Sequence, residues 1–88
     1  MPEREVRIVN KLGIHARPAA EIVKTAGKFR STITIIREDL EVNAKSIMGV
    51  MMLAAEFGST ISLRATGEDA DAALDAPAAV IANKFGES

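Results

Sequence analysis

The sequence contains no cysteine, tryptophan or tyrosine, and it contains a single histidine. Without cysteine, the chain can form neither a disulfide framework nor a thiolate metal site, which is typical of proteins from a reducing compartment. One histidine is also too little for a dedicated transition-metal site. We therefore predict no metal and no cofactor, and we expect a cytoplasmic protein.

Aromatic residues and net charge are also scarce. Three phenylalanines are the only aromatic side chains, and the formal net charge is −1 at pH 7. A general nucleic-acid binder offers stacking surface and positive charge, so the composition argues against that class. No apolar run approaches the roughly 20 residues that cross a membrane, and the polar start MPERE does not resemble a signal peptide. We expect no nucleic-acid partner and no membrane insertion.

The 88 residues, 48% of them apolar and 26% charged, suit one globular domain that covers residues 1–88. No linker or internal repeat divides them, and we expect a monomer. Alternating apolar residues predict strands, and helical spacing predicts helices. The expected strands cover residues 5–9, 31–37, 40–43 and 60–66, and the expected helices cover 16–28, 46–54 and a last segment that begins after residue 69 and reaches Phe85.

This β-α-β-β-α-β-α order predicts an α+β fold, in which a mostly antiparallel sheet carries the helices on one side. The side chains expected on the packed face of the sheet are Val6, Ile8, Ile33, Ile35, Leu40, Val42, Ile61 and Leu63. Those expected on the buried face of the first helix are Ala16, Ala19, Ala20, Val23 and Ala26, with a left-handed stop at Gly27. Pro77 falls inside the last helix, where proline costs about 3 kcal/mol, so we expect a kink or a break there.

The single histidine, His15, lies in the segment GIHARPA at residues 13–19, where a loop ends and a helix is predicted to begin. A lone histidine is more often structural or solvated than catalytic, but its neighbours argue otherwise. The free N–H groups of Ala16 and Arg17 in a first helical turn favour an anion, phosphate above all. The guanidinium of Arg17 adds a planar fork suited to phosphate oxygens. A nucleophilic nitrogen, a phosphate cradle and a fixed positive charge together predict phosphoryl transfer through His15.

A second segment of interest is KSIMGVM at residues 45–51. Ser46 precedes an apolar helical face and is a good N-cap residue. Methionine-rich helices can form adaptable docking surfaces as well as core. The helix phase predicts that Met51 faces inward, whereas Met48 and Met52 face outward.

Through these two segments the sequence resembles the HPr family, the histidine phosphocarriers of the bacterial phosphotransferase system, and the resemblance covers essentially the whole chain. It implies an open-faced β-sandwich with a four-stranded antiparallel sheet and three helices packed on one face. It also implies a carrier rather than an enzyme, which takes a phosphoryl group from phosphorylated Enzyme I and passes it to enzyme IIA proteins.

The resemblance further implies roles for individual residues. His15 corresponds to the phosphoryl acceptor, through its Nδ1 atom, and Arg17 to its charge partner. Ser46 corresponds to the residue that a dedicated ATP-dependent kinase, an HPr kinase/phosphorylase, modifies for regulation in many members. The implied docking patch for partners consists of Ile47, Met48 and Met51, to which the outward-facing Met52 adds.

Three positions depart from the usual family pattern. Ala54 stands where many members have glycine, Phe57 where they tend to be polar, and Pro77 where they carry an aliphatic residue in the helix core. None of the three belongs to the His15 motif. Phe57 and Pro77 therefore bear on partner choice and on local helix geometry.

Two other functions remain open. A regulatory paralogue in a nitrogen-related phosphorelay would share the His15 motif, although the Ser46 segment favours a kinase-regulated carrier. A ferredoxin-like binding module shares the β-α-β-β-α-β order, but the RNA-binding version needs exposed aromatics and the metal-binding version needs paired cysteines. A free-standing hydrolase is disfavoured, because no second histidine and no cysteine is available to build a triad.

Overall fold

The computed structural model describes residues 2–87 and has the predicted β-α-β-β-α-β-α order. A short 3₁₀ turn follows the last helix. The elements are β1 (Glu3–Arg7), α1 (Ala16–Ala26), β2 (Thr32–Arg37), β3 (Leu40–Asn43), α2 (Ile47–Met52), β4 (Thr60–Thr66), α3 (Ala70–Ala82) and η1 (Lys84–Gly86).

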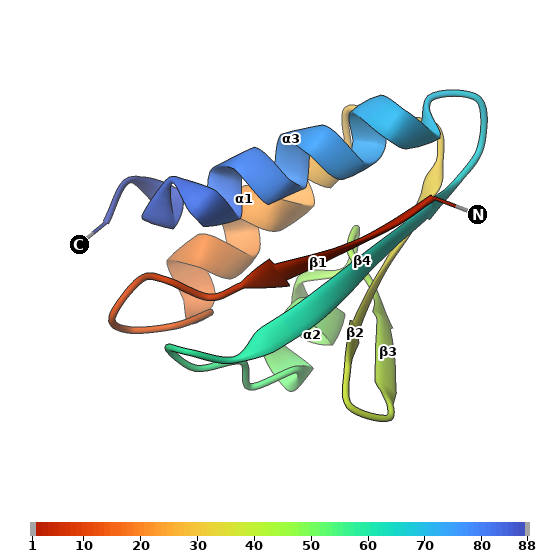
Figure 1. Ribbon diagram of the computed structural model, residues 1–88. Helices are drawn as coiled ribbons and strands as arrows, with labels where there is room; N and C mark the ends of the chain where they lie inside the picture. Colours follow the sequence, from red (N-terminus) through yellow and green to blue (C-terminus); the bar gives the residue numbers. More distant parts are fainter. Residues whose placement is uncertain (1, 88) are drawn as a thin grey trace.

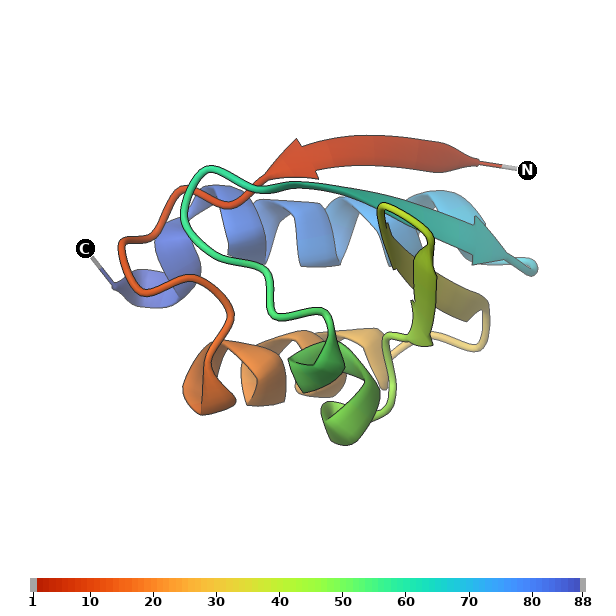
Figure 2. The same ribbon diagram turned by 90° about the horizontal axis from the view of Figure 1, so that it is seen from below.

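The four strands form one antiparallel sheet in the order β1-β4-β2-β3 (Figure 1). The β2–β3 hairpin is local, but β1 pairs with β4, the last strand, with Val6 opposite Ile61. The helices gather on one side of this sheet, as Figure 2 shows from below. The expected two-layer α+β architecture, an open-faced sandwich, is confirmed.

The core lies between the sheet and the helices. It is built from fully buried branched side chains of β2, β4, α1 and α3 and of the residue that follows β1; they include Ile8, Ile22, Ile33, Ile35, Ile61, Leu63 and Ile81. Such packing of apolar area, rather than helix propensity, stabilises short helices in a domain of this size.

The buried face of α1 differs from the expected one. Ala16 and Ala20 are exposed, whereas Ile22 and Thr25 are buried. Both phases satisfy an i, i+3, i+4 pattern, and the structure selects the one that buries the large isoleucine instead of small alanines. The helix also ends differently, because Gly27 has φ −64° and makes no left-handed stop.

Two further expectations about burial are wrong. Leu40 is 39% exposed because it opens β3 at the tip of the hairpin, although it shares the inward parity of Val42. Met51 is 44% exposed, because α2 is less than two turns long and buries Val50 instead.

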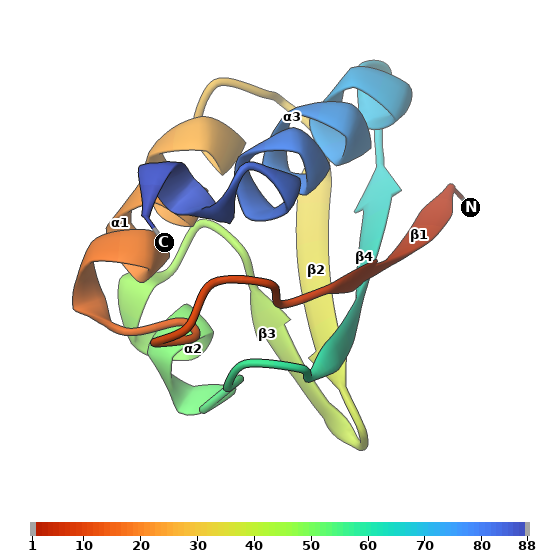
Figure 3. The same cartoon turned by 60° about the vertical axis from the view of Figure 1, so that its left-hand side comes forward.

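The helix α3 runs without a break from Ala70 to Ala82, with Pro77 buried inside it. The expected break at Pro77 is therefore absent. The helix ends before Phe85, and the chain then turns sharply through η1, where Lys84, Phe85 and Gly86 all have positive φ values. This turn directs the end of the chain back toward α1 (Figure 3).

Among the described residues, no helix combines the length and the apolar character needed to span a lipid bilayer.

Candidate functional site

His15 is the N-cap residue of α1, as the sequence predicts, and has an extended backbone. The loop before it is held against the segment that follows α2, because the Ile14 N–H donates to the Ala55 carbonyl at 2.8 Å. Gly13 makes this approach possible: it has φ +67°, and a Cβ there would lie 2.6 Å from the Ala55 oxygen. The position of His15 is thus fixed by backbone contacts on the chain before it and by α1 after it.

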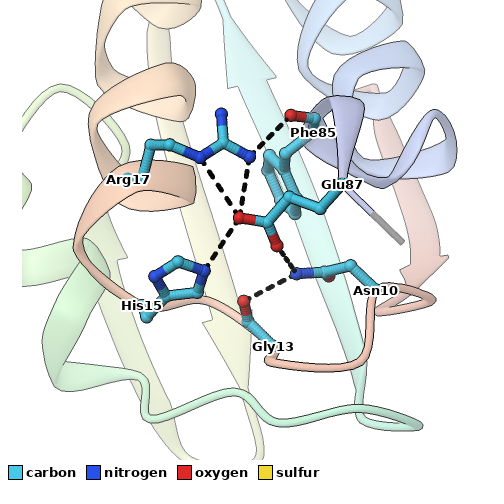
Figure 4. Close-up of polar contacts among 6 residues, drawn as sticks. All are labelled: Asn10, Gly13, His15, Arg17, Phe85 and Glu87. Carbon is cyan, nitrogen blue, oxygen red and sulfur yellow. Dashed lines mark hydrogen bonds and ion pairs between the residues drawn. The ribbon is translucent and has the colours of Figure 1, made fainter.

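The imidazole of His15 makes no capping hydrogen bond to its own helix. Its Nε2 atom instead lies 2.9 Å from a carboxylate oxygen, Oε2 of Glu87 (Figure 4). The side chain remains 39% exposed. The opposite ring nitrogen, Nδ1, points away from Glu87 (Figure 4). The N–H groups of Ala16 and Arg17 have no carbonyl four residues earlier within the helix to bond, so they can receive an anion.

Arg17 lies beside His15 on the first turn of α1, but it already has partners. A terminal guanidinium nitrogen of Arg17 lies 2.7 Å from Glu87 Oε2. It also donates to the carbonyl of Phe85 at 2.9 Å. In this state the positive charge predicted to balance a phosphoryl group is therefore balanced by Glu87.

Sequence reasoning missed two residues of this site, Glu87 and Asn10. The second oxygen of Glu87, Oε1, accepts a hydrogen bond from Asn10 Nδ2 at 2.9 Å. This bond, followed by those from Arg17 and His15, holds the pKa of Glu87 below its usual range. The Glu87 side chain is only 15% exposed. Three side chains, those of Asn10, His15 and Arg17, thus converge on the Glu87 carboxylate (Figure 4).

Ser46 is the N-cap of α2, as predicted, and its Oγ accepts a hydrogen bond from the Gly49 N–H at 3.1 Å. The helix that it opens presents apolar side chains to solvent. With two neighbouring loop residues they form what we call the apolar patch: Leu12 (74% exposed), Ile47 (43%), Met48 (71%), Met51 (44%), Met52 (65%) and Phe57 (60%). The Ile14–Ala55 hydrogen bond links the two loops, so the patch lies beside the chain that leads to His15.

Residues 2–83 match the family model described as the PTS HPr component phosphorylation site. The phosphocarrier protein HPr of Cupriavidus necator is 52% identical over 87 residues, which are 99% of this chain and 98% of that protein. The phosphocarrier protein NPr of Shewanella violacea is 45% identical over 86 residues, 98% of this chain and 94% of that protein.

Solved structures agree with these relatives. The crystal structure of HPr-C-His from Thermoanaerobacter tengcongensis superposes with a TM-score of 0.95 at 46% identity, and the match covers 100% of this chain and 99% of that one. Matches of this extent and identity establish the family of the chain. The chain belongs to the HPr family, the phosphocarrier proteins of the phosphotransferase system, which carry a phosphoryl group and are not catalytic enzymes.

Proposed function

We propose that His15 accepts a phosphoryl group from phosphorylated Enzyme I and passes it to enzyme IIA proteins. The observation that carries this proposal is the half-exposed imidazole at the N-terminus of α1, next to an arginine and to free first-turn N–H groups. The Nδ1 lone pair forms the N–P bond while the bond between phosphorus and Enzyme I breaks. The helix N-terminus and Arg17 offset the negative charge that arrives.

The transfer has two steps, and each uses the same parts of the site. In the first, Nδ1 is the nucleophile and Enzyme I the leaving group. In the second, the acceptor on enzyme IIA attacks phosphorus and the imidazole leaves. Because the partners supply the other reacting groups, the chain needs only an accessible nitrogen and a site that tolerates both charge states.

The test is phosphorylation in vitro. The chain, incubated with Enzyme I and phosphoenolpyruvate, should gain one phosphoryl group by mass spectrometry, and the adduct should be labile in acid and stable in base. His15→Ala should gain none, while circular dichroism shows that it remains folded. If His15→Ala still acquires an acid-labile adduct, another residue is the acceptor and the proposal is wrong.

The apolar patch supports a docking role in this transfer. Six large apolar side chains are exposed on α2 and on the loops beside the His15 segment, and an exposed apolar patch is typical of an interaction site. A flexible methionine-rich surface can fit more than one partner, as a carrier between two proteins requires. We infer that Enzyme I and enzyme IIA use this surface in turn.

Ser46 is our candidate for regulation by an HPr kinase/phosphorylase. It is partly exposed at the start of α2, and Ile47 and Met48 of the apolar patch follow it directly. A phosphate there would place about two negative charges at the edge of the docking surface. It would thereby disfavour acidic partners without requiring any change of fold.

A nitrogen-related phosphorelay is the second candidate, since a relative with a different name, phosphocarrier protein NPr, is 45% identical to this chain. The two candidates share the His15 chemistry and differ in the partner. Competition between a sugar-system Enzyme I and its nitrogen-related paralogue for the same chain distinguishes the two candidate functions by the ratio of transfer rates.

The same preparations show the oligomeric state. We expect a monomer by sedimentation, although one similar structure is described as an HPr dimer from Thermoanaerobacter tengcongensis.

A further inference from the structure

The end of the chain is built into the His15 site. Glu87 lies 72 residues from His15 in sequence, yet its Oε2 is 2.9 Å from the imidazole Nε2. The same oxygen accepts from Arg17, and Oε1 accepts from Asn10. Both carboxylate oxygens are therefore in use, and the group is mostly shielded from solvent.

The backbone that delivers Glu87 is strained. Lys84 and Phe85 have φ values of 58° and 55°, and Gly86 has 75°, so three successive residues are left-handed. For the two non-glycine residues this conformation is unfavourable and persists only where the surroundings impose it. Here the buried ring of Phe85 anchors the turn, and Arg17 bonds its carbonyl. The strain is offset by contacts whose effect is to aim Glu87 at His15.

Asn10 fixes the other side of the carboxylate. It is fully buried, and its Nδ2 donates to both the Gly13 carbonyl and Glu87 Oε1. The amide nitrogen must face these two oxygens, because an oxygen in its place would be repelled by both. Within residues 2–87, the Asn10 Oδ1 atom is then left without a hydrogen-bond partner. The two bonds that Asn10 donates hold the Glu87 carboxylate against the loop before α1.

We propose that Glu87 is a positioning residue, which accepts the Nε2 proton of His15 and so leaves the Nδ1 lone pair free for phosphorus, with Asn10 holding the carboxylate in place. An ionised carboxylate can only accept hydrogen bonds, so the Nε2 beside it must carry the proton. In the neutral ring, Nδ1 is then the unprotonated nitrogen. This inference rests on the proposed function, in which Nδ1 is the nucleophile.

The same contact acts during transfer. When Nδ1 bonds phosphorus, the ring becomes cationic and its proton stays on Nε2. Glu87 stabilises that cation in place, so no proton has to leave or arrive. When the phosphoryl group departs to the next acceptor, the ring returns to the same tautomer. A competing role is that Glu87 occupies Arg17 and so obstructs phosphorylation; it predicts the opposite effect on the rate.

The test combines an NMR spectrum of the free protein with the rate of phosphoryl transfer from Enzyme I. Imidazole ¹⁵N chemical shifts, recorded at a pH where the ring is neutral, should show a protonated Nε2 and an unprotonated Nδ1 in the wild type. Glu87→Ala should move both shifts toward the average of two tautomers. The transfer rate from phosphorylated Enzyme I should fall about tenfold, as expected for losing a hydrogen bond to a charged group. Glu87→Gln keeps an acceptor oxygen and should restore the shifts more fully than the rate.

Glu68→Gln is the matched control, because Glu68 is exposed and lies at the opposite end of α3. It removes the same charge and should leave shifts and rate unchanged. Wild-type shifts in Glu87→Ala, or an unchanged or faster rate, would overturn the positioning role. Failure of the proposed function gives a different result, since the wild type itself would then take no phosphoryl group while the tautomer shifts remain measurable. Asn10→Ala should repeat the effect of Glu87→Ala, and if it does not fold, the Glu87 variants decide.

Discussion

At the scale of single residues, Glu87 and an incoming phosphoryl group compete for the guanidinium of Arg17. Its guanidinium bonds Glu87 and the Phe85 carbonyl, so in the unphosphorylated protein it ties the C-terminal turn to α1. A phosphoryl group on His15 would offer stronger negative charge nearby. Arg17 therefore links the state of His15 to the state of the last residues, and its replacement should affect both.

Arg17→Ala should slow phosphoryl transfer and release the C-terminal turn. The sequence alone suggests almost no effect on stability, but the ion pair to Glu87 raises the expected loss to at most about 1 kcal/mol, because Arg17 is half-exposed. Arg17→Lys should recover part of the stability and less of the rate, since an ammonium cannot bond two oxygens as a planar fork does. Transfer-rate assays measure the first effect, and hydrogen exchange of residues 84–87 measures the release of the turn. A variant with wild-type transfer would show that Arg17 only anchors the turn.

The sequence predicts His15 and Arg17 because their chemistry is local, within three consecutive residues at a helix start. It does not predict Glu87, since an acidic residue near a chain end is ordinarily a solvated charge. Its role depends on three left-handed residues, and in the local sequence only Gly86 favours that conformation, whereas Lys84 and Phe85 do not. The sequence does not predict the role of Asn10 either, because asparagine is common in loops and its burial here follows from long-range packing.

At the scale of elements, the residues at the helix N-termini have different structural roles. Ser46 Oγ stabilises α2 through the Gly49 N–H, and Asp69 joins the start of α3 to the segment before β2. The Ser46 cap follows from capping rules, whereas the Asp69 side chain makes no capping bond in its own helix and its contacts with Arg30 and Ser31 are long-range. The buried face of α1 did not follow, since two helical phases of that segment have similar apolar patterns, and only the sheet decides between them.

Ser46 variants separate capping from charge. Ser46→Ala should lose about 1 kcal/mol of stability through the missing cap and transfer nearly normally. Ser46→Asp keeps a capping oxygen and adds charge, so it should fold but associate more slowly with an acidic Enzyme I. Ser46→Asn is the neutral capping control and should behave as the wild type. Transfer rates across a salt series provide the measurement. Equal rates for the Asp and Asn variants at low salt, where screening is weakest, would refute regulation by charge.

Asp69 should make stability depend on acid pH. The Ser31 hydroxyl and the backbone N–H of Arg30 bond its carboxylate, and these contacts lower the pKa of Asp69 from 3.8 to about 2. Because the folded state holds the ionised form more tightly than the unfolded state does, the stabilisation is present above about pH 4. It is lost as the pH falls toward 2.

The measurement is urea unfolding of Asp69→Asn and of the wild type between pH 7 and pH 2. The variant should be less stable at pH 7, and the difference should shrink as the pH falls through the range in which Asp69 titrates. Asp71→Asn, exposed in the first turn of α3, is the control and should show no such trend. A constant difference at all pH values would mean that Asp69 acts through shape and not through charge.

At the scale of the whole molecule, the fold brings three distant segments to one end: the loop before α1, the short α2 and the C-terminal turn. The order of elements and the two-layer packing follow from the periodicity of the sequence, because each amphipathic segment needs a partner for its apolar face. The strand order β1-β4-β2-β3 does not follow from that periodicity. The pairing of β1 with β4 closes a long loop of the chain, and no local sequence pattern indicates it. The same long-range pairing sets the loops that carry the apolar patch.

Truncation of that patch should weaken association without loosening the fold. Met48 and Phe57 are 71% and 60% exposed, so replacing both with alanine should change the free energy of unfolding by less than about 1 kcal/mol. The dissociation constant for Enzyme I should rise about tenfold, as for loss of apolar anchors at the centre of an interface. Leu40→Ala is the control, because Leu40 is an exposed leucine outside the patch. Titration calorimetry with Enzyme I measures binding, and single-turnover transfer at saturating Enzyme I measures the chemical step. The double variant should regain the wild-type rate at saturation, because His15 and Glu87 are unaltered; binding as tight as in the wild type would place the docking surface elsewhere.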